Sequence, residues 1–187
     1  MERRGLRTRG PGGYGTGPQH PDPQGVAVDI AAIESRRQAI KRRMAELDRL
    51  STSDARALDK AMTEMCALYA EYARSTVALV AFEAYRTLVE RTPEDTGRAR
   101  ASWNLGAEPS DAVPPAGDYP EFRGDVSAAV EQAIAKVGAD AESFSITSDL
   151  DYMPFLEAGW SEQAPAGFIA LTFREAAEQL GQMAREA

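Results

Sequence analysis

Apolar side chains recur every three or four residues over the first long patterned stretch of the chain, which predicts an amphipathic helix from Asp29 to about Leu50. Its opposite face carries closely spaced Lys and Arg, so the helix is basic. Such a face fits a solvated surface and a binding surface equally well. The apolar positions are Ile33, Ile40, Met44 and Leu47.

The next helix is predicted to be much longer, because no proline or glycine interrupts the chain from Asp54 to Arg91. At a rise of 1.5 Å per residue it would be about 55 Å long. One small domain cannot cover such a helix, so we expect either the first helix or neighbouring subunits to pack on it. Cys66 falls within the apolar pattern, and we expect a buried thiol. One apolar stripe contains Leu58, Met62, Met65, Tyr69, Tyr72, Thr76 and Leu79.

After Pro93 the period of the pattern changes from helical to alternating, which predicts a strand over residues 99–106. A second short strand is predicted over 143–148, with helices over 125–139 and 168–185. Residues 108–122 are rich in Pro, Gly and Asp and predict a surface loop. Together these elements predict an α+β fold with a long helix or helical hairpin and a small, mainly antiparallel sheet covered by helices.

Charge divides the chain into a basic beginning and an acidic remainder. The whole chain has a net charge of −8, but residues 1–50 carry ten Lys and Arg against six Asp and Glu. Residues 51–187 carry eleven against twenty-three. Residues 1–28 are rich in Gly and Pro, so we expect a flexible basic arm that seeks an anionic partner, followed by one domain over 29–187. The arm contacts are predicted at Arg3, Arg4, Arg7 and Arg9.

Composition argues against several kinds of site. With one cysteine and one histidine, the chain offers neither an internal disulfide nor a Cys/His zinc site, and we expect no metal and no cofactor. His20 lies in the Gly/Pro-rich arm, which makes a serine–histidine catalytic arrangement a poor fit. No apolar stretch approaches the roughly 20 residues that span a membrane. We therefore expect a soluble, cytoplasmic protein with no membrane partner.

The segment from Arg91 to Trp103, RTPEDTGRARASW, is predicted to form a rigid corner. Pro93 ends the long helix, because proline disfavours helical geometry in the residue before it. Asp95 or Thr96 can bond to the backbone of the following turn, and Gly97 supplies a positive φ. On physical grounds alone this is a helix-to-strand corner.

The same residues resemble the T-P-x-D-T-G-x-(L/A)-x-x-S-W signature of neck and tail-completion proteins, which join head to tail in long-tailed bacteriophages. A second segment, YMPFLEAGWSEQAPAG over residues 152–167, resembles the Y-A-x-x-L-E-x-G-x-S-x-Q-A-P-x-G stretch of that family, with Met153 in place of a small residue. The resemblance covers residues 60–185 and leaves out the basic arm. The matching positions are Thr92, Pro93, Asp95, Thr96, Gly97, Ser102, Trp103, Tyr152, Leu156, Glu157, Gly159, Trp160, Gln163, Pro165 and Gly167.

The resemblance implies a structural virion protein, assembled in the host cytoplasm, that forms a ring, usually of six subunits, at the head-to-tail junction. Its neighbours would be the portal or adaptor on one side and the tail tube or tail terminator on the other. DNA would pass through the lumen without sequence-specific binding, and an acidic body suits this because it repels phosphates. A tail terminator or a head-side stopper ring of the same particle stays open as an alternative.

Two further interpretations come from other functional classes. Asp149, Asp151 and Glu157 could act as the carboxylates of a hydrolase, but carboxylates are abundant throughout this chain. The basic arm and first helix could bind nucleic acid, yet Tyr14 is the only aromatic residue among the first fifty, so stacking partners for bases are scarce. We therefore expect no catalytic residues. In the structural interpretation Glu157 bonds to a backbone amide or an arginine, and Trp160 anchors packing or a subunit contact.

Overall fold

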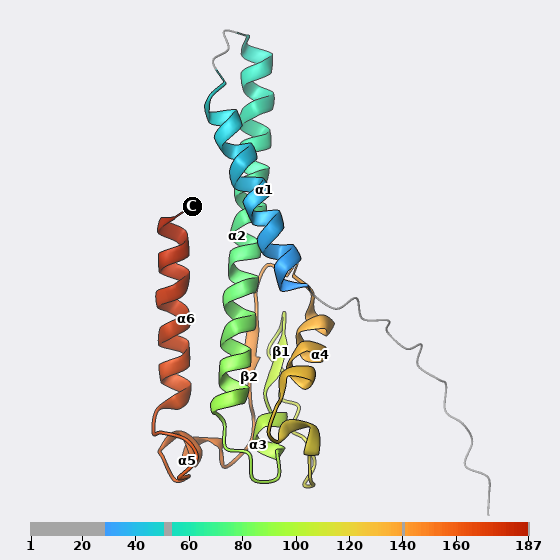
Figure 1. The fold of residues 1–187 in the computed structure, drawn as a ribbon, viewed down its shortest axis with the longest axis vertical. Coiled ribbons are helices and arrows are strands. Elements are labelled where there is room, and N and C mark those ends of the chain that lie inside the picture. Colours follow the sequence, from blue (N-terminus) through green and yellow to red (C-terminus); the bar gives the residue numbers. More distant parts are fainter. Residues whose placement is uncertain (1–28, 51–53, 140, 187) are drawn as a thin grey trace, which may run out of the picture.

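The computed structural model describes residues 29–50, 54–139 and 141–186. The predicted arm contacts at Arg3, Arg4, Arg7 and Arg9 lie outside the described residues. The fold begins with a hairpin of two helices, α1 (Ile30–Asp48) and α2 (Ala55–Arg91) (Figure 1). The first helix therefore folds back on the N-terminal half of the second, one of the two ways of covering it that the length of α2 had suggested. Aspartate side chains cap both helices, Asp29 through the amide of Ala32 and Asp54 through that of Arg56.

The hairpin is held by a small apolar cluster and by arginines that reach from α1 to α2. Ile40 and Met44 of α1 pack with Tyr72 of α2. The guanidinium of Arg37 donates to the hydroxyls of Tyr72 and Thr76, at 2.9 and 3.0 Å, and lies over the Tyr72 ring. Part of the basic face of α1 is thus used inside the molecule, a use that the sequence pattern had not indicated.

The main core surrounds the C-terminal half of α2, which lies between α6 (Phe168–Arg185) on one side and α4 (Ser127–Val137) with a two-stranded sheet on the other (Figure 1). Strands β1 (Asn104–Gly106) and β2 (Ser145–Thr147) pair antiparallel, with Leu105 opposite Ile146. The α+β class is confirmed, although helices dominate and each strand is short. The most deeply buried large side chains include Phe82, Tyr85, Leu88, Ile134, Leu150 and Phe168.

The predicted strand over residues 99–106 is wrong in its first half. Residues Arg98–Ala101 form a helical turn, α3, and only Asn104–Gly106 are extended. Alternation of Ala with Arg suggested a strand with one buried face, but both residue types favour helices. The amide of Ala101 closes the turn on the carbonyl of Gly97 at 2.9 Å, and the arginines bind carbonyl oxygens of nearby segments.

The remaining elements follow the predicted order: α6 has the predicted bounds 168–185, and α4 and β2 are shorter than predicted. The loop predicted over 108–122 ends in a short 3-10 helix, η1 (Pro120–Phe122), and the turn-rich stretch before α6 contains a short helix, α5 (Met153–Glu157). Helix α4 and strand β2 lie inside the predicted ranges 125–139 and 143–148. Among the described residues, no helix is both long enough and apolar enough to cross a bilayer.

Exposure departs from the sequence pattern near the tip of the hairpin. Cys66 was expected to be buried and is exposed. In the predicted α2 stripe, Tyr72, Thr76 and Leu79 are buried, whereas Leu58, Met62 and Tyr69 are about half exposed, at 49%, 60% and 51%. The stripe is therefore covered by its own chain only along its C-terminal part.

The buried Tyr85 makes stability depend on alkaline pH. Burial raises the pKa of the Tyr85 phenol from 10.0 to about 12. A raised folded-state pKa contributes stability that is present below pH 10 and is lost between about pH 10 and 12, amounting to roughly 2–3 kcal/mol. We expect Tyr85→Phe to remove this dependence. Urea unfolding of both proteins at pH 8, 10 and 11.5 measures it, and parallel losses in the two proteins would contradict it.

Candidate functional site

The corner that follows α2 is fixed by one buried hydroxyl. Thr92 is 1% exposed, and its Oγ1 donates to the carbonyl of Leu88 at 2.6 Å. The same oxygen accepts the indole N–H of Trp103 at 2.8 Å. Trp103 is itself 6% exposed, so both ends of this bond are shielded from water. Thr92 and Trp103, the first and last motif positions of the predicted corner, are therefore bonded to one another across eleven residues.

Arg100 holds the same corner from the opposite side. Its guanidinium donates to the carbonyls of Thr92 at 2.7 Å and Glu90 at 3.2 Å and pairs with the carboxylate of Glu94 at 2.8 Å. That carboxylate also accepts the amide of Gly124 at 2.8 Å. These two contacts, the Gly124 amide first and the Arg100 charge second, hold the pKa of Glu94 below its usual value. The end of α2 is thus bonded to the loop before α4.

Gly97 permits a close backbone approach as well as the turn. Its φ is 78°, which confirms the predicted left-handed conformation, and a Cβ at this position would overlap the carbonyl oxygen of Tyr119. The Tyr119 amide donates to the carbonyl of Thr96 at 2.8 Å, so the long loop is fastened to the corner here. The Thr96 hydroxyl accepts the amide of Arg98 at 3.4 Å, as expected for one of the two candidate turn side chains.

The second motif forms the connection from α5 to α6, and Glu157 organises it. Its carboxylate accepts the amides of Ile169 at 2.8 Å and Ala170 at 3.1 Å, two of the free N–H groups at the start of α6. A carboxylate is favourable there because it also faces the positive end of the helix dipole. The backbone amide of Gly167 donates to the carbonyl of Glu157 at 2.8 Å. The expectation that Glu157 bonds to a backbone amide is confirmed.

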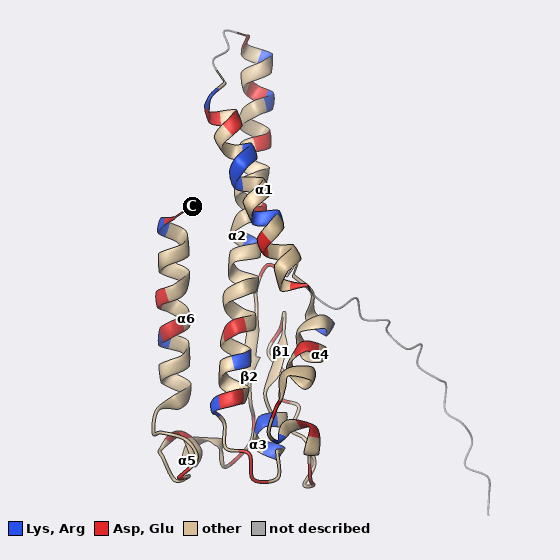
Figure 2. Ribbon diagram, in the orientation of Figure 1, with Lys and Arg blue, Asp and Glu red and all other residues tan. Residues whose placement is uncertain are grey.

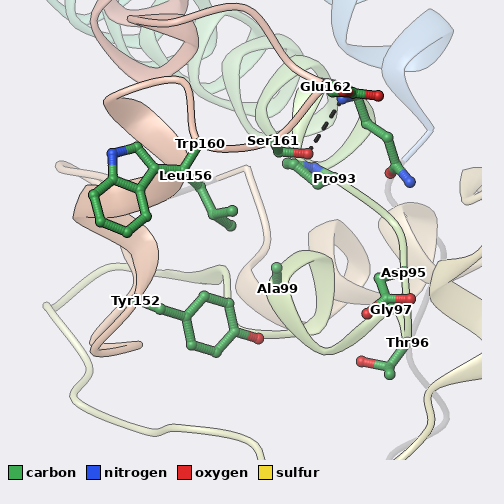
Figure 3. Close-up of a pocket in the computed structure, with 11 residues that line it drawn as sticks. Pro93, Asp95, Thr96, Gly97, Ala99, Tyr152, Leu156, Trp160, Ser161 and Glu162 are labelled. Atoms are coloured by element: carbon green, nitrogen blue, oxygen red, sulfur yellow. Dashed lines mark hydrogen bonds between the residues drawn. The ribbon is translucent and has the colours of Figure 1, made fainter.

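The two motifs lie against one another. The Oε1 atom of Gln163 accepts the amide of Glu94 at 2.9 Å, which joins residues 69 positions apart. Between the motifs is a hollow of about 500 Å³ (Figure 3). Figure 3 shows Tyr152, Leu156 and Trp160 at one side of it and residues of the corner at the other. Corner residues lining the hollow are Pro93, Asp95, Thr96, Gly97 and Ala99.

Trp160 is the most exposed large apolar side chain among the described residues, at 76%. Its ring contacts that of Phe155, which is 48% exposed, with centroids 4.8 Å apart. The neighbouring Gly159 has a φ of 86°, and a Cβ there would press on the Cβ of Ala166. The backbone therefore presents the indole outward from a tightly folded connection, and we call Phe155 and Trp160 the corner patch.

The carboxylates considered for hydrolysis have different surroundings. The Glu157 carboxylate is bonded to the first amides of α6, whereas Asp149 and Asp151 are exposed. Within the described ranges, no group of three or more His, Cys, Asp or Glu side chains is placed to hold a metal ion. What this arrangement does chemically is to lock two segments together and present an aromatic surface beside them.

The predicted motif residues meet at this junction, where they fall into two main groups. One group fixes the backbone or bonds across the junction: Thr92, Gly97, Ser102, Trp103, Glu157, Gly159, Gln163 and Gly167. Within this group, the Ser102 hydroxyl lies 2.7 Å from the hydroxyl of Ser148. A second group lines the hollow between the motifs: Pro93, Asp95, Thr96, Tyr152, Leu156 and Trp160. The remaining motif residue, Pro165, is exposed on the connection from α5 to α6.

Sequence reasoning missed Arg100, Glu94 and Tyr119. Arg100 had been assigned to the polar face of a strand, and only a helical interpretation of 98–101 would have turned it toward α2. Glu94 lies inside the predicted corner, where its position beside Pro93 gave no sign of a partner thirty residues away. Tyr119 acts through its backbone, which leaves no mark in the pattern of side chains.

Neither the family models nor the curated proteins nor the solved structures with which the chain was compared include a match.

The Thr92–Trp103 bond predicts a specific stability loss. In Thr92→Val the buried indole N–H loses its acceptor, which should lower the free energy of unfolding by about 1–3 kcal/mol. Thr63→Val is the matched control, because Thr63 makes the same bond to the carbonyl four residues earlier but is exposed. Chemical denaturation monitored by tryptophan fluorescence measures both. Equal effects of the two substitutions would show that the indole bond is unimportant.

A glycine pair separates the two demands made at Gly97. Gly97→Ala meets both a positive φ and the Tyr119 carbonyl, whereas Gly167→Ala meets nearly the same left-handed backbone, φ 79° and ψ 20° against φ 78° and ψ −9°, with nothing within 4 Å of the added carbon. We expect Gly167→Ala to cost about 1–2 kcal/mol and Gly97→Ala to cost more. Thermal unfolding of both variants measures the difference. Equal decreases in stability in the two variants would mean that the backbone at Tyr119 can move away from the added Cβ at no cost in free energy.

Proposed function

We propose that this chain is a structural protein of a bacteriophage neck, where it forms a ring that joins head to tail and lets DNA pass through its lumen. The proposal rests on the resemblance of its two motifs to the neck and tail-completion family. It is supported by the way in which these motifs meet: their polar groups bond within the chain, and one of their two tryptophans, Trp160, is turned outward. A junction of this kind suits assembly.

The observation that carries the proposal is the 76% exposure of the Trp160 side chain, in contrast to Trp103, whose indole is buried and bonded to the Thr92 hydroxyl. Large exposed aromatic residues on rigid backbone are typical of binding hot spots. Their exposure to water is unfavourable in a free chain and is relieved when a partner covers them. The corner patch therefore favours a partner protein, as a ring subunit or a neighbouring neck component would provide.

Charge is consistent with passage of DNA. Residues 29–187, which include both helices of the hairpin, carry ten more acidic than basic side chains, so the folded body repels phosphate at the surfaces where carboxylates gather. Figure 2 shows acidic and basic residues interspersed on α1 and on α6, acidic residues in the lower loops, and basic residues on α3. A lumen wall of this sign would let a duplex slide without the tight, salt-dependent binding that basic surfaces produce.

The two tryptophans provide the test. We expect particles assembled with Trp160→Ala to give separate heads and tails, with the isolated variant as stable as the wild type, because an exposed ring contributes little to folding. Trp103→Ala should also prevent joining, but by destabilising the subunit by about 3–5 kcal/mol. Electron microscopy of particles and thermal unfolding of the isolated chains measure the two effects.

The result against the proposal is equally concrete. Normal infectious particles from both variants, or antibody labelling away from the head-to-tail junction, would reject a role in the neck. Negative-stain imaging of the wild type completes the test, since the proposal expects rings with a central opening.

A further inference from the structure

Besides the corner patch, the described residues carry a second apolar surface, located on the hairpin. It is a hollow of about 440 Å³ between α1 and α2, closed at one side by Glu186, whose carbonyl accepts the Lys41 ammonium at 2.7 Å, and its apolar lining comes from Met44, Met65 and Tyr69. Tyr69 is 51% exposed there, and Met62 and Leu58 continue the exposed stripe toward the tip of the hairpin. We call this the hairpin hollow. Methionine and tyrosine make it a favourable lining for an aromatic ring.

The hairpin hollow and the corner patch cannot meet within one chain. Tyr69 and Arg91 lie 22 residues apart on one continuous helix, which separates them by about 33 Å at 1.5 Å per residue. Pro93, just beyond Arg91, lines the same hollow as Trp160. Figure 1 accordingly shows α5 at the end of the molecule opposite to the tip of the hairpin. Neither surface can therefore cover the other within one chain.

We propose that Trp160 of one copy inserts into the hairpin hollow of the next, so that the copies associate head to tail. This inference rests on the proposed ring and names the two surfaces that close it. A protruding aromatic group and a pocket elsewhere on the same chain make a heterologous contact, which propagates into a ring or a filament rather than stopping at a dimer.

Charge favours this pairing over a contact between two identical surfaces. Helix α1 and its cap Arg49 carry six Lys and Arg against three Asp and Glu, whereas residues 149–163, which contain the corner patch, carry none against four. Two corner patches would bring two acidic segments together, and two hairpins would bring two basic helices together. Corner against hairpin brings opposite signs together, which favours association.

The polar groups of the hairpin hollow also suit an indole. Lys41 lines it, and the Lys41 ammonium already lies 5.5 Å from the centre of the Tyr72 ring, so a second ring entering the hollow gains a cation–π partner. Asp48 at the same site offers an oxygen that can accept an indole N–H. An aromatic side chain with one polar edge is therefore the group that this lining fits best.

A mixing experiment tests the head-to-tail order. Trp160→Ala removes the inserted ring, and Ala45→Glu blocks the hollow at an exposed position of its lining. We expect each variant alone to be monomeric by light scattering, because every contact needs one intact surface of each kind. An equimolar mixture should form a 1:1 dimer and stop there. Ala73→Glu, an exposed position on α2 outside the hollow, should assemble as the wild type does.

Cys66 gives an independent readout, because it is the only cysteine and is exposed beside Met65. A short bismaleimide should link Glu162→Cys chains into a ladder of covalent oligomers, through Cys66 of one copy and residue 162 of the next. The wild type, and Glu162→Cys combined with Cys66→Ser, should give no ladder. Dimers from Cys66 alone would indicate paired hairpins and would overturn the head-to-tail order.

The outcomes separate this inference from the proposed function. Rings that persist in Trp160→Ala, without a Cys66 to residue 162 link, would reject the surfaces named here while leaving a ring-forming neck protein intact. The ladder together with open filaments would support the surfaces and count against a closed ring. A wild type that stays monomeric at its highest soluble concentration, with no ladder, would overturn the inference.

Discussion

The hydroxyl of Thr92 is the point on which the arrangement of this molecule depends. It ends α2 by bonding back to Leu88 and accepts the indole of Trp103, so the last turn of the long helix and the start of β1 are fixed relative to one another. Neither partner can turn to water instead, because both are buried. An unpaired buried donor is costly, and this makes the direction in which the chain leaves α2 a consequence of one bond.

From that corner the rest of the lower half follows in sequence. Arg100 joins the end of α2 to Glu94, Glu94 joins Gly124, and Gln163 binds the Glu94 amide, so three separate segments converge on a few residues. Most of these bonds use backbone groups, which are fixed more firmly than long side chains. These bonds fix the position of the connection between α5 and α6 relative to α2. They thereby also fix the outward direction of Trp160.

The hydrophobic period located the helices well because each is long and has one continuous apolar face. It failed over residues 98–101, where four residues are too few for a period of two to be distinguished from a helical turn, and the outcome was decided by Gly97 and by carbonyl partners from other segments. It also placed Cys66 inside, because an apolar pattern along α2 does not say which face of the helix its neighbour α1 covers. The site was recognisable from its motifs, but its bonding through Arg100 and Glu94 depends on contacts distant in sequence.

The uncovered length of that stripe carries the functional argument one step further. Helix α1 runs beside the N-terminal half of α2, with Arg36 paired to Glu71 and Arg43 to Glu64, but a single helix covers only one face of its partner. The chain therefore leaves Leu58, Met62 and Tyr69 exposed at one end and Trp160 at the other, joined by a helix too stiff to bring them together. An apolar surface is normally kept small on a protein that works alone. Two such surfaces of different shape, held apart at fixed distance, are the property that a repeating head-to-tail assembly requires of its subunit.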